Sequence, residues 1–291
     1  MSGSALLSAF PSHWLWGALI FLLGTLAGRG LGMVVQAFAE AECPPGAAPP
    51  ARGRRELIPV LGPMLAPRRP GFRRAALLEL LGGGVVLACW LLFPPAKAAC
   101  GCIFVLGLIG ASVIDLDHMI IPDFFTMGLA LAGVLLSIAV PALHRMGPFG
   151  PEACVRSGAA ALLGIGLGSA LPLWFGLVGE RVLQKEVLGF GDVKFLGAIG
   201  AFCGWQGAVF SLFGGAVVGA VALVLAALHE RLAPGRPARL LHLESADGQS
   251  ARLGWGVHFP FGPMLAIAAG LYFLALHPWV DGYLARYQAL F

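Results

Sequence analysis

Long runs of hydrophobic residues, separated by short polar segments, dominate the sequence. A helix needs about 20 apolar residues to cross a bilayer, and seven runs reach or approach that length, while an eighth, 193–205, is shorter and interrupted by glycines. That segment and the run after it predict a tight helical hairpin that turns at Gln206-Gly207. If the short segment is re-entrant, the chain has seven spans instead of eight. The eight predicted spans are residues 14–38, 75–93, 98–114, 124–143, 155–178, 193–205, 208–228 and 259–276.

The composition supports the same fold class. Hydrophobic residues make up 58% of the 291 positions and charged residues only 12%, with a mean hydropathy of +0.84. A soluble domain has about 25% charged residues, and a disordered chain has low hydrophobicity, so both classes are excluded. The formal charge of +4 is too small to indicate nucleic acid as a partner. We therefore predict an all-α polytopic membrane protein with about eight transmembrane helices.

The basic residues predict the orientation of these helices. If the loop after the first span is cytoplasmic and eight spans alternate, 14 Lys and Arg residues fall on the cytoplasmic side and 4 on the other, with Arg29 inside the first span left out. The positive-inside rule then places both chain ends outside and the long loops inside. The chain divides into a first transmembrane helix (1–38), a basic cytoplasmic loop (39–74) and a membrane core (75–291). In the last long loop, 229–256, residues 240–252 predict a short hairpin around Asp247-Gly248.

Two carboxylates at the ends of predicted spans are candidates for chemistry. Asp115 ends the third span, and Asp192 lies between the fifth and sixth spans at the same predicted cytoplasmic depth. Two neighbouring carboxyls cannot both ionise cheaply, so one stays protonated while the other acts as a base. Such a pair can activate water for attack on a peptide carbonyl and then protonate the leaving amine. The alternative for each aspartate alone is an interfacial anchor, which is how we interpret Asp117 and Asp123 from their positions.

Several strings in order along the chain resemble one family. Asp115 and Asp117 belong to Ile-Asp-Leu-Asp-His, Ile-Pro-Asp follows at 121–123, and Asp192 belongs to Gly-Phe-Gly-Asp-Val-Lys at 189–194. These strings are similar to the two signatures of the type IV prepilin peptidases, which are intramembrane aspartic proteases of the Gly-x-Gly-Asp type. Further matches are Glu-Leu-Ile-Pro at 56–59, Leu-Leu-Glu-Leu at 77–80, Gly-Ala-Phe-Cys-Gly-Trp at 200–205 and Pro-Phe-Gly-Pro at 260–263.

This resemblance implies a function and a site. Asp115 and Asp192 would be the catalytic pair, supported by Gly189, Gly191, Lys194 and Asp117. The substrates would be prepilins or pseudopilins of type IV pili and type II secretion, cut after a glycine on the cytoplasmic side of the bacterial inner membrane. The peptidase activity would need no cofactor. Many members also methylate the new N-terminus with S-adenosylmethionine. The partners expected are therefore these substrates and membrane lipid.

The chain departs from this pattern in its N-terminal part. Many bifunctional members carry two Cys-x-x-Cys pairs in the first loop, a spacing typical of zinc sites, whereas here that loop has Cys43 as its sole cysteine. We therefore predict no metal. The family's Gly-Ser-Phe-Leu-Asn-Val reads Gly-Arg-Gly-Leu-Gly-Met at 28–33, without the asparagine. This difference leaves methylation open. The role of the 229–256 loop, the pilins that are cut, the oligomeric state and the identity of the protonated aspartate also stay open.

Two other classes of function fit the sequence less well. A proton- or ion-coupled transporter would need a polar path across the membrane and inverted repeats, yet the acids here gather toward one face. A catalytically silent membrane subunit of a secretion system would not need both aspartates and their flanking glycines. Presenilin-type proteases share the Gly-x-Gly-Asp string but lack the surrounding strings. The sequence therefore favours the prepilin peptidase.

Overall fold

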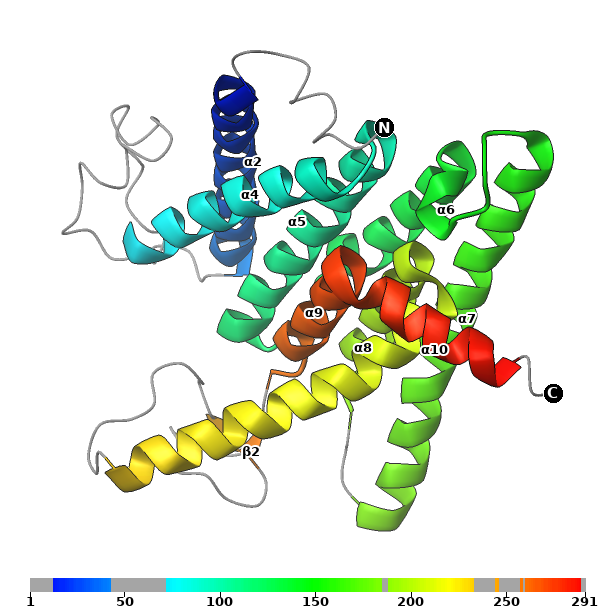
Figure 1. The fold of residues 1–291 in the computed structure, drawn as a ribbon. Helices are drawn as coiled ribbons and strands as arrows, with labels where there is room; N and C mark the ends of the chain where they lie inside the picture. Colours follow the sequence, from blue (N-terminus) through cyan, green and yellow to red (C-terminus); the bar gives the residue numbers. More distant parts are fainter. Residues whose placement is uncertain are drawn as a thin grey trace. The chain divides into compact units, whose positions relative to one another are not determined.

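The computed structural model describes residues 13–42, 72–184, 188–232, 244–245, 257–258 and 260–288 (Figure 1). The predicted cytoplasmic loop therefore lies largely outside the described residues. The chain forms two compact units, Met1–Gly110 and Ala111–Phe291, and each is described by itself below. Helix α5 (Pro95–His118) runs through the boundary between them.

The helices are long and apolar, as expected for a multi-pass membrane protein. Among the described residues, six helical stretches have the length and composition to cross a membrane, and Phe124–Ala139 is a shorter apolar helix. Many large hydrophobic side chains are exposed, among them Leu131, Trp174 and Val224, because the apolar surface of such helices faces lipid rather than water. The polytopic helical fold class is confirmed, and the predicted count of eight holds approximately.

The first unit holds α2 (His13–Glu42) and α4 (Phe72–Leu92), which pack closely against each other. Small residues allow this approach, since a Cβ on Gly24 would lie 2.7 Å from the carbonyl oxygen of Gly82. An ion pair lies in the same contact, with 3.3 Å between Arg29 Nη1 and Glu79 Oε1, and both side chains are buried. The arginine that departs from the family string therefore has a carboxylate partner inside the unit.

In the second unit, α5 ends and is followed by a π-helical turn, η2 (Phe124–Gly128), which continues into α6 (Leu129–Ala139). The predicted fourth span thus stops at Ala139, and a 3-10 turn, η3 (Pro141–His144), follows it. The longer helices are α7 (Pro151–Leu183) and α8 (Phe190–Leu232). The last predicted span is continued by a π-helical turn and a further helix, in the order α9 (Gly262–Leu271), η4 (Tyr272–Leu276) and α10 (His277–Gln288).

Helix α8 consists of two arms that meet at Gly204 (Figure 1). The backbone of Gly204 has φ 69° and ψ 179°, a conformation that favours glycine because it has no Cβ. The predicted turn at Gln206-Gly207 was therefore placed slightly too late. The first arm, 190–203, is about 21 Å long at 1.5 Å per residue, and so is shorter than the bilayer's apolar core of about 30 Å.

The first arm of α8 is the core of the second unit. Its side chains Phe195, Leu196, Ile199 and Phe202 are at most 1% exposed, and α8 packs against α6, α7 and α9. The arm's end is capped by polar groups: the carbonyl oxygen of Ala201 lies 3.3 Å from Ser137 Oγ and 3.1 Å from His144 Nε2. A helix that stops inside a bilayer needs such partners for its last carbonyls.

A short antiparallel pairing joins β1 (Glu244–Ser245) to β2 (Val257–His258). The predicted hairpin within 240–252, turning at Asp247-Gly248, was wrong, because the partner of 244–245 lies beyond residue 252. The prediction rested on the turn residues Asp247-Gly248, which do not reveal the more distant partner. Residues 247 and 248 themselves lie outside the described part of the chain.

Glycines bring α7 and α8 into backbone contact. Gly164 faces Gly200 so closely that a Cβ on either residue would overlap the carbonyl oxygen of the other, whereas a Cβ on Gly166 would meet nothing within 4 Å. Gly164 and Gly200 are therefore helix-packing residues that allow the two backbones to approach each other. We expect Gly164→Ala to destabilise the protein by about 1–3 kcal/mol or more through overpacking. Gly166→Ala, on the same helix, should be neutral or slightly stabilising. Thermal unfolding in detergent would measure the difference, and equal melting temperatures would contradict this account.

Candidate active site

Asp115 lies in the last turn of α5, which ends at His118. Met119 has a left-handed backbone with φ 52°, and its N–H donates to the carbonyl oxygen of Asp115 over 2.9 Å. The segment 119–123 then leads away from the helix toward η2. The side chain of Asp115 is buried, with 5% of it exposed. A buried carboxyl at the C-terminal end of a helix is unfavourable unless other groups compensate for its charge.

The start of α9 supplies that compensation. The backbone N–H of Gly262 donates a hydrogen bond to Asp115 Oδ2 over 3.0 Å. Gly262 is the first residue of α9, so its N–H has no partner within the helix, and Pro263 has no N–H at all. A carboxylate there also faces the positive end of the helix dipole. The Pro-Phe-Gly-Pro string therefore binds Asp115.

The absence of a side chain at position 262 is part of the same contact. A Cβ on Gly262 would lie 2.6 Å from Asp115 Oδ2 and 3.0 Å from Ile121 Cδ1. Ile121, which is buried, comes from the segment 119–123 and also lies against Gly191, where a Cβ would be 3.6 Å from Ile121 Cβ. Ile121 thus connects the segment after α5 with the starts of α8 and α9.

Asp192 lies in the first turn of α8, and its backbone N–H donates to the carbonyl oxygen of Gly189 over 3.1 Å. Its carboxyl is close enough to that of Asp115 for the two groups to interact electrostatically. The structure therefore brings together the two aspartates that the sequence singled out, although 77 positions separate them in the chain. An acid in the first helical turn is also favourable to the helix dipole.

The supporting residues fall in different places. A Cβ on Gly189 would lie 3.4 Å from Asp192 Oδ2, so this glycine borders that carboxyl. Gly191 instead faces Ile121, and Asp117 is exposed on the last turn of α5. Lys194 Nζ lies 2.7 Å from Asp123 Oδ1. The structure thus pairs Lys194 with Asp123, which sequence reasoning interpreted as an interfacial anchor.

Two sets of contacts were missed by the sequence reasoning. The Pro-Phe-Gly-Pro string was matched to the family but given no role, although prolines on both sides of a glycine at a helix start indicate a free backbone N–H. The pairing of Lys194 with Asp123 had no local signal, because it joins residues 71 positions apart. Among the described residues, no group of three His, Cys, Asp or Glu side chains is arranged to hold a metal ion.

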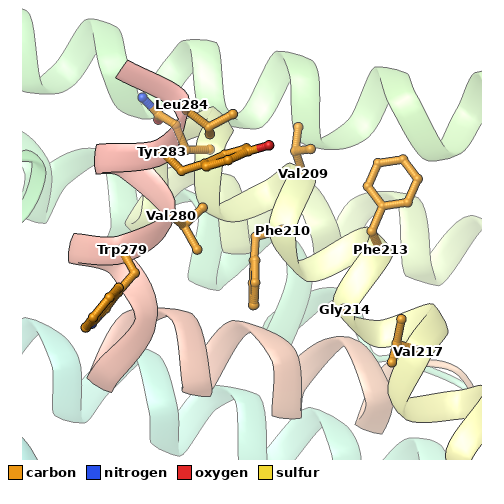
Figure 2. Close-up of a pocket in the computed structure, with 10 residues that line it drawn as sticks. Val209, Phe210, Phe213, Gly214, Val217, Trp279, Val280, Tyr283 and Leu284 are labelled. Atoms are coloured by element: carbon orange, nitrogen blue, oxygen red, sulfur yellow. The ribbon is translucent and has the colours of Figure 1, made fainter. Parts of the chain in front are cut away.

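An apolar pocket lies elsewhere, between α8 and α10, with a volume of about 650 Å³. Figure 2 shows Phe210 and Val280 pointing into the gap between the two helices, with Trp279 and Tyr283 on the α10 side. The aspartates are not among its lining residues. Its lining is almost wholly apolar, as expected for a surface that faces acyl chains.

Comparisons with known proteins show the family of this chain. Residues 102–224 match the type IV leader peptidase family, and this range contains both Asp115 and Asp192. A prepilin leader peptidase/N-methyltransferase of Klebsiella pneumoniae is 31% identical over 69% of this chain and 92% of its own length. The protein of that name from Myxococcus xanthus is 28% identical over 94% of this chain and 95% of its own length. The one from Pseudomonas aeruginosa is 32% identical over 56% of this chain and 44% of its own length. No solved structure matches.

The fold and the comparisons together define a multi-pass membrane peptidase. The chain belongs to the type IV leader peptidase family. A transporter finds no support in these comparisons.

Proposed function

We propose that this chain cleaves the leader peptides of prepilins or pseudopilins after a glycine, with Asp115 and Asp192 as the catalytic pair. The observation that carries the proposal is the buried carboxyl of Asp115, which accepts a hydrogen bond from Gly262 N–H and interacts electrostatically with the carboxyl of Asp192. The names of the relatives support the substrate class. The excess of Lys and Arg in the predicted cytoplasmic loops supports a site on the cytoplasmic side of the inner membrane.

The reaction follows from two carboxyls that share one proton. A water molecule between them attacks the carbonyl carbon of the glycine and gives a proton to the ionised carboxylate. The protonated carboxyl gives its proton to the carbonyl oxygen, which forms a tetrahedral diol. When the C–N bond breaks, the first carboxyl returns its proton to the amine nitrogen. The second takes a proton back as the carboxylic acid product forms, and the pair is restored.

Cleavage supported by a carboxyl pair should proceed without added cofactor. We expect a prepilin mixed with the enzyme in membranes to be cut equally well with or without EDTA and in the absence of S-adenosylmethionine. Mass spectrometry should find the new N-terminus directly after a glycine. Loss of cleavage in EDTA, with recovery on adding a divalent metal, would contradict this mechanism.

Methylation is a second candidate activity, which the names of the relatives favour. In the described part of the first unit, Arg29 and Glu79 are buried against each other. We derive no step through S-adenosylmethionine. The same cleavage reaction with S-adenosylmethionine added would test for methylation, because transfer of one methyl group adds about 14 Da to the mature pilin.

A further inference from the structure

The family resemblance makes Lys194 a supporting residue without naming its partner, and the structure gives it an acidic partner, Asp123. Lys194 Nζ donates a hydrogen bond to Asp123 Oδ1 over 2.7 Å. The lysine is 21% exposed and the aspartate 70% exposed. Lys194 Nζ also lies 5.1 Å from the centre of the Phe190 ring, on the same helical turn, which favours a cation–π contact. The lysine is thus held from two sides.

The two partners lie on the two segments that carry the catalytic aspartates. Lys194 is two residues after Asp192 in α8, and Asp123 closes the segment 119–123 that follows the helix of Asp115. Between them, Ile121 lies against both Gly191 and Gly262. The ion pair therefore ties the segment after α5 to the start of α8 at the point where the carboxyls must keep a fixed distance.

The ion pair between Lys194 and Asp123 is formed at neutral pH. The ammonium of Lys194 holds the pKa of Asp123 below its usual range, because it donates a hydrogen bond to the carboxylate and attracts its charge. A depressed carboxyl pKa means that the interaction is present above the ordinary value of about 4 and is lost as the pH falls through the lowered value.

We propose that the ion pair of Asp123 and Lys194 is a clasp that positions Asp115 and Asp192 for cleavage. The inference rests on the proposed function of the two aspartates. An exposed ion pair contributes little to stability, so we expect this pair to act by fixing the geometry of the site. A displacement of about 1 Å in a catalytic group can cost on the order of 100-fold in rate. Lys194 and Asp123 are positioning residues and do not touch the reacting atoms.

A double-mutant cycle in purified, detergent-solubilised enzyme tests the clasp. We expect Asp123→Asn and Lys194→Met each to lower kcat about ten-fold or more, with little change in KM, and the double variant to be no worse than either single one. Lys194→Arg should keep most of the activity, because arginine can bind the same carboxylate. Asn at 123 retains an acceptor for the hydroxyl of Thr126, which lies 3.5 Å from Asp123 Oδ1.

The matched control is Glu152→Gln at the start of α7. Glu152 forms an exposed ion pair with Arg156, also with 2.7 Å between nitrogen and oxygen, and its loss should leave kcat unchanged. If Asp123→Asn cleaves like the wild type while Lys194→Met does not, the lysine acts on the aspartates directly and the clasp is wrong. Asp123→Asn and Lys194→Met could instead lower the yield of folded protein while the kcat per folded molecule stays unchanged. The ion pair would then contribute to stability only, and the proposal would also be overturned.

Asp192→Asn, measured in parallel, separates the two proposals. If it is inactive while the clasp variants behave like the wild type, the clasp fails and the catalytic pair stands. If it cleaves normally, the catalytic assignment itself fails, and the clasp fails with it.

Discussion

Asp115→Asn and Asp192→Asn should each reduce prepilin cleavage by about 10²–10⁴-fold or more, the range that general acid–base catalysis contributes. Asparagine has nearly the size of aspartate and still accepts a hydrogen bond from Gly262 N–H at position 115. It can neither hold nor release the shared proton. The folded structure should therefore survive while the chemistry is lost. The measurement is the rate of leader removal per inserted enzyme, in membranes that contain equal amounts of each variant.

The same substitution at Asp281 is the matched control. Asp281 is a partly buried carboxylate of α10 that accepts a hydrogen bond from the hydroxyl of Tyr272 over 2.6 Å and pairs with Arg145. Tyr272 lies ten residues beyond Gly262, which corresponds to about 15 Å along a helix. Asp281→Asn should cleave at close to the wild-type rate. Wild-type rates from both Asp115→Asn and Asp192→Asn would show that these carboxyls are interfacial anchors.

The second large effect is expected at Gly262. In Gly262→Ala the new methyl group would lie 2.6 Å from Asp115 Oδ2, closer than nonbonded atoms allow. The carboxylate is the free end of a side chain, so it can move aside without displacing the backbone. In doing so it leaves the Gly262 N–H and its position opposite Asp192. We expect kcat to fall on the order of 100-fold, while the melting temperature changes by only a few degrees.

Gly270→Ala, in the same helix, is the control for this second prediction. A Cβ on Gly270 would meet nothing within 4 Å, so activity should be unchanged. A Gly262→Ala enzyme that cleaves normally would mean that the hydrogen bond to Asp115 is not needed for catalysis. One that fails to fold would mean that the methyl group displaces the backbone rather than the carboxylate.

The sequence predicted those features that depend on local composition. Runs of apolar residues identified most of the helices, because a bilayer requires long apolar stretches with internally paired backbones. Burial of acids is costly, and this drew attention to Asp115 and Asp192. The predicted ends were less accurate where a single backbone conformation decides them. Gly204, for example, is one of several glycines in its segment, and only the structure shows which one adopts the positive φ.

The contacts around the aspartates could not be predicted in the same way. Gly262 and Asp115 are 147 positions apart. The sequence around either residue does not indicate that the other is its hydrogen-bond partner. Asp123 was interpreted as an interfacial anchor, and in the structure it directly precedes η2. Its pairing with Lys194 depends on how α8 packs beside the segment after α5. Such pairings are set by tertiary structure, and periodicity along the chain does not encode them.

The hydrogen bond from Gly262 to Asp115 also has a consequence for biosynthesis. A ribosome that adds about 5–20 residues per second needs on the order of ten seconds to pass from Asp115 to Gly262, which lie 147 positions apart. In the later part of that interval, once Asp192 has been added, the nascent chain holds both aspartates but lacks the donor that orients one of them. The enzyme therefore becomes competent only when its last apolar helix has been inserted, and a chain that stalls before that point carries both acids without an assembled protease.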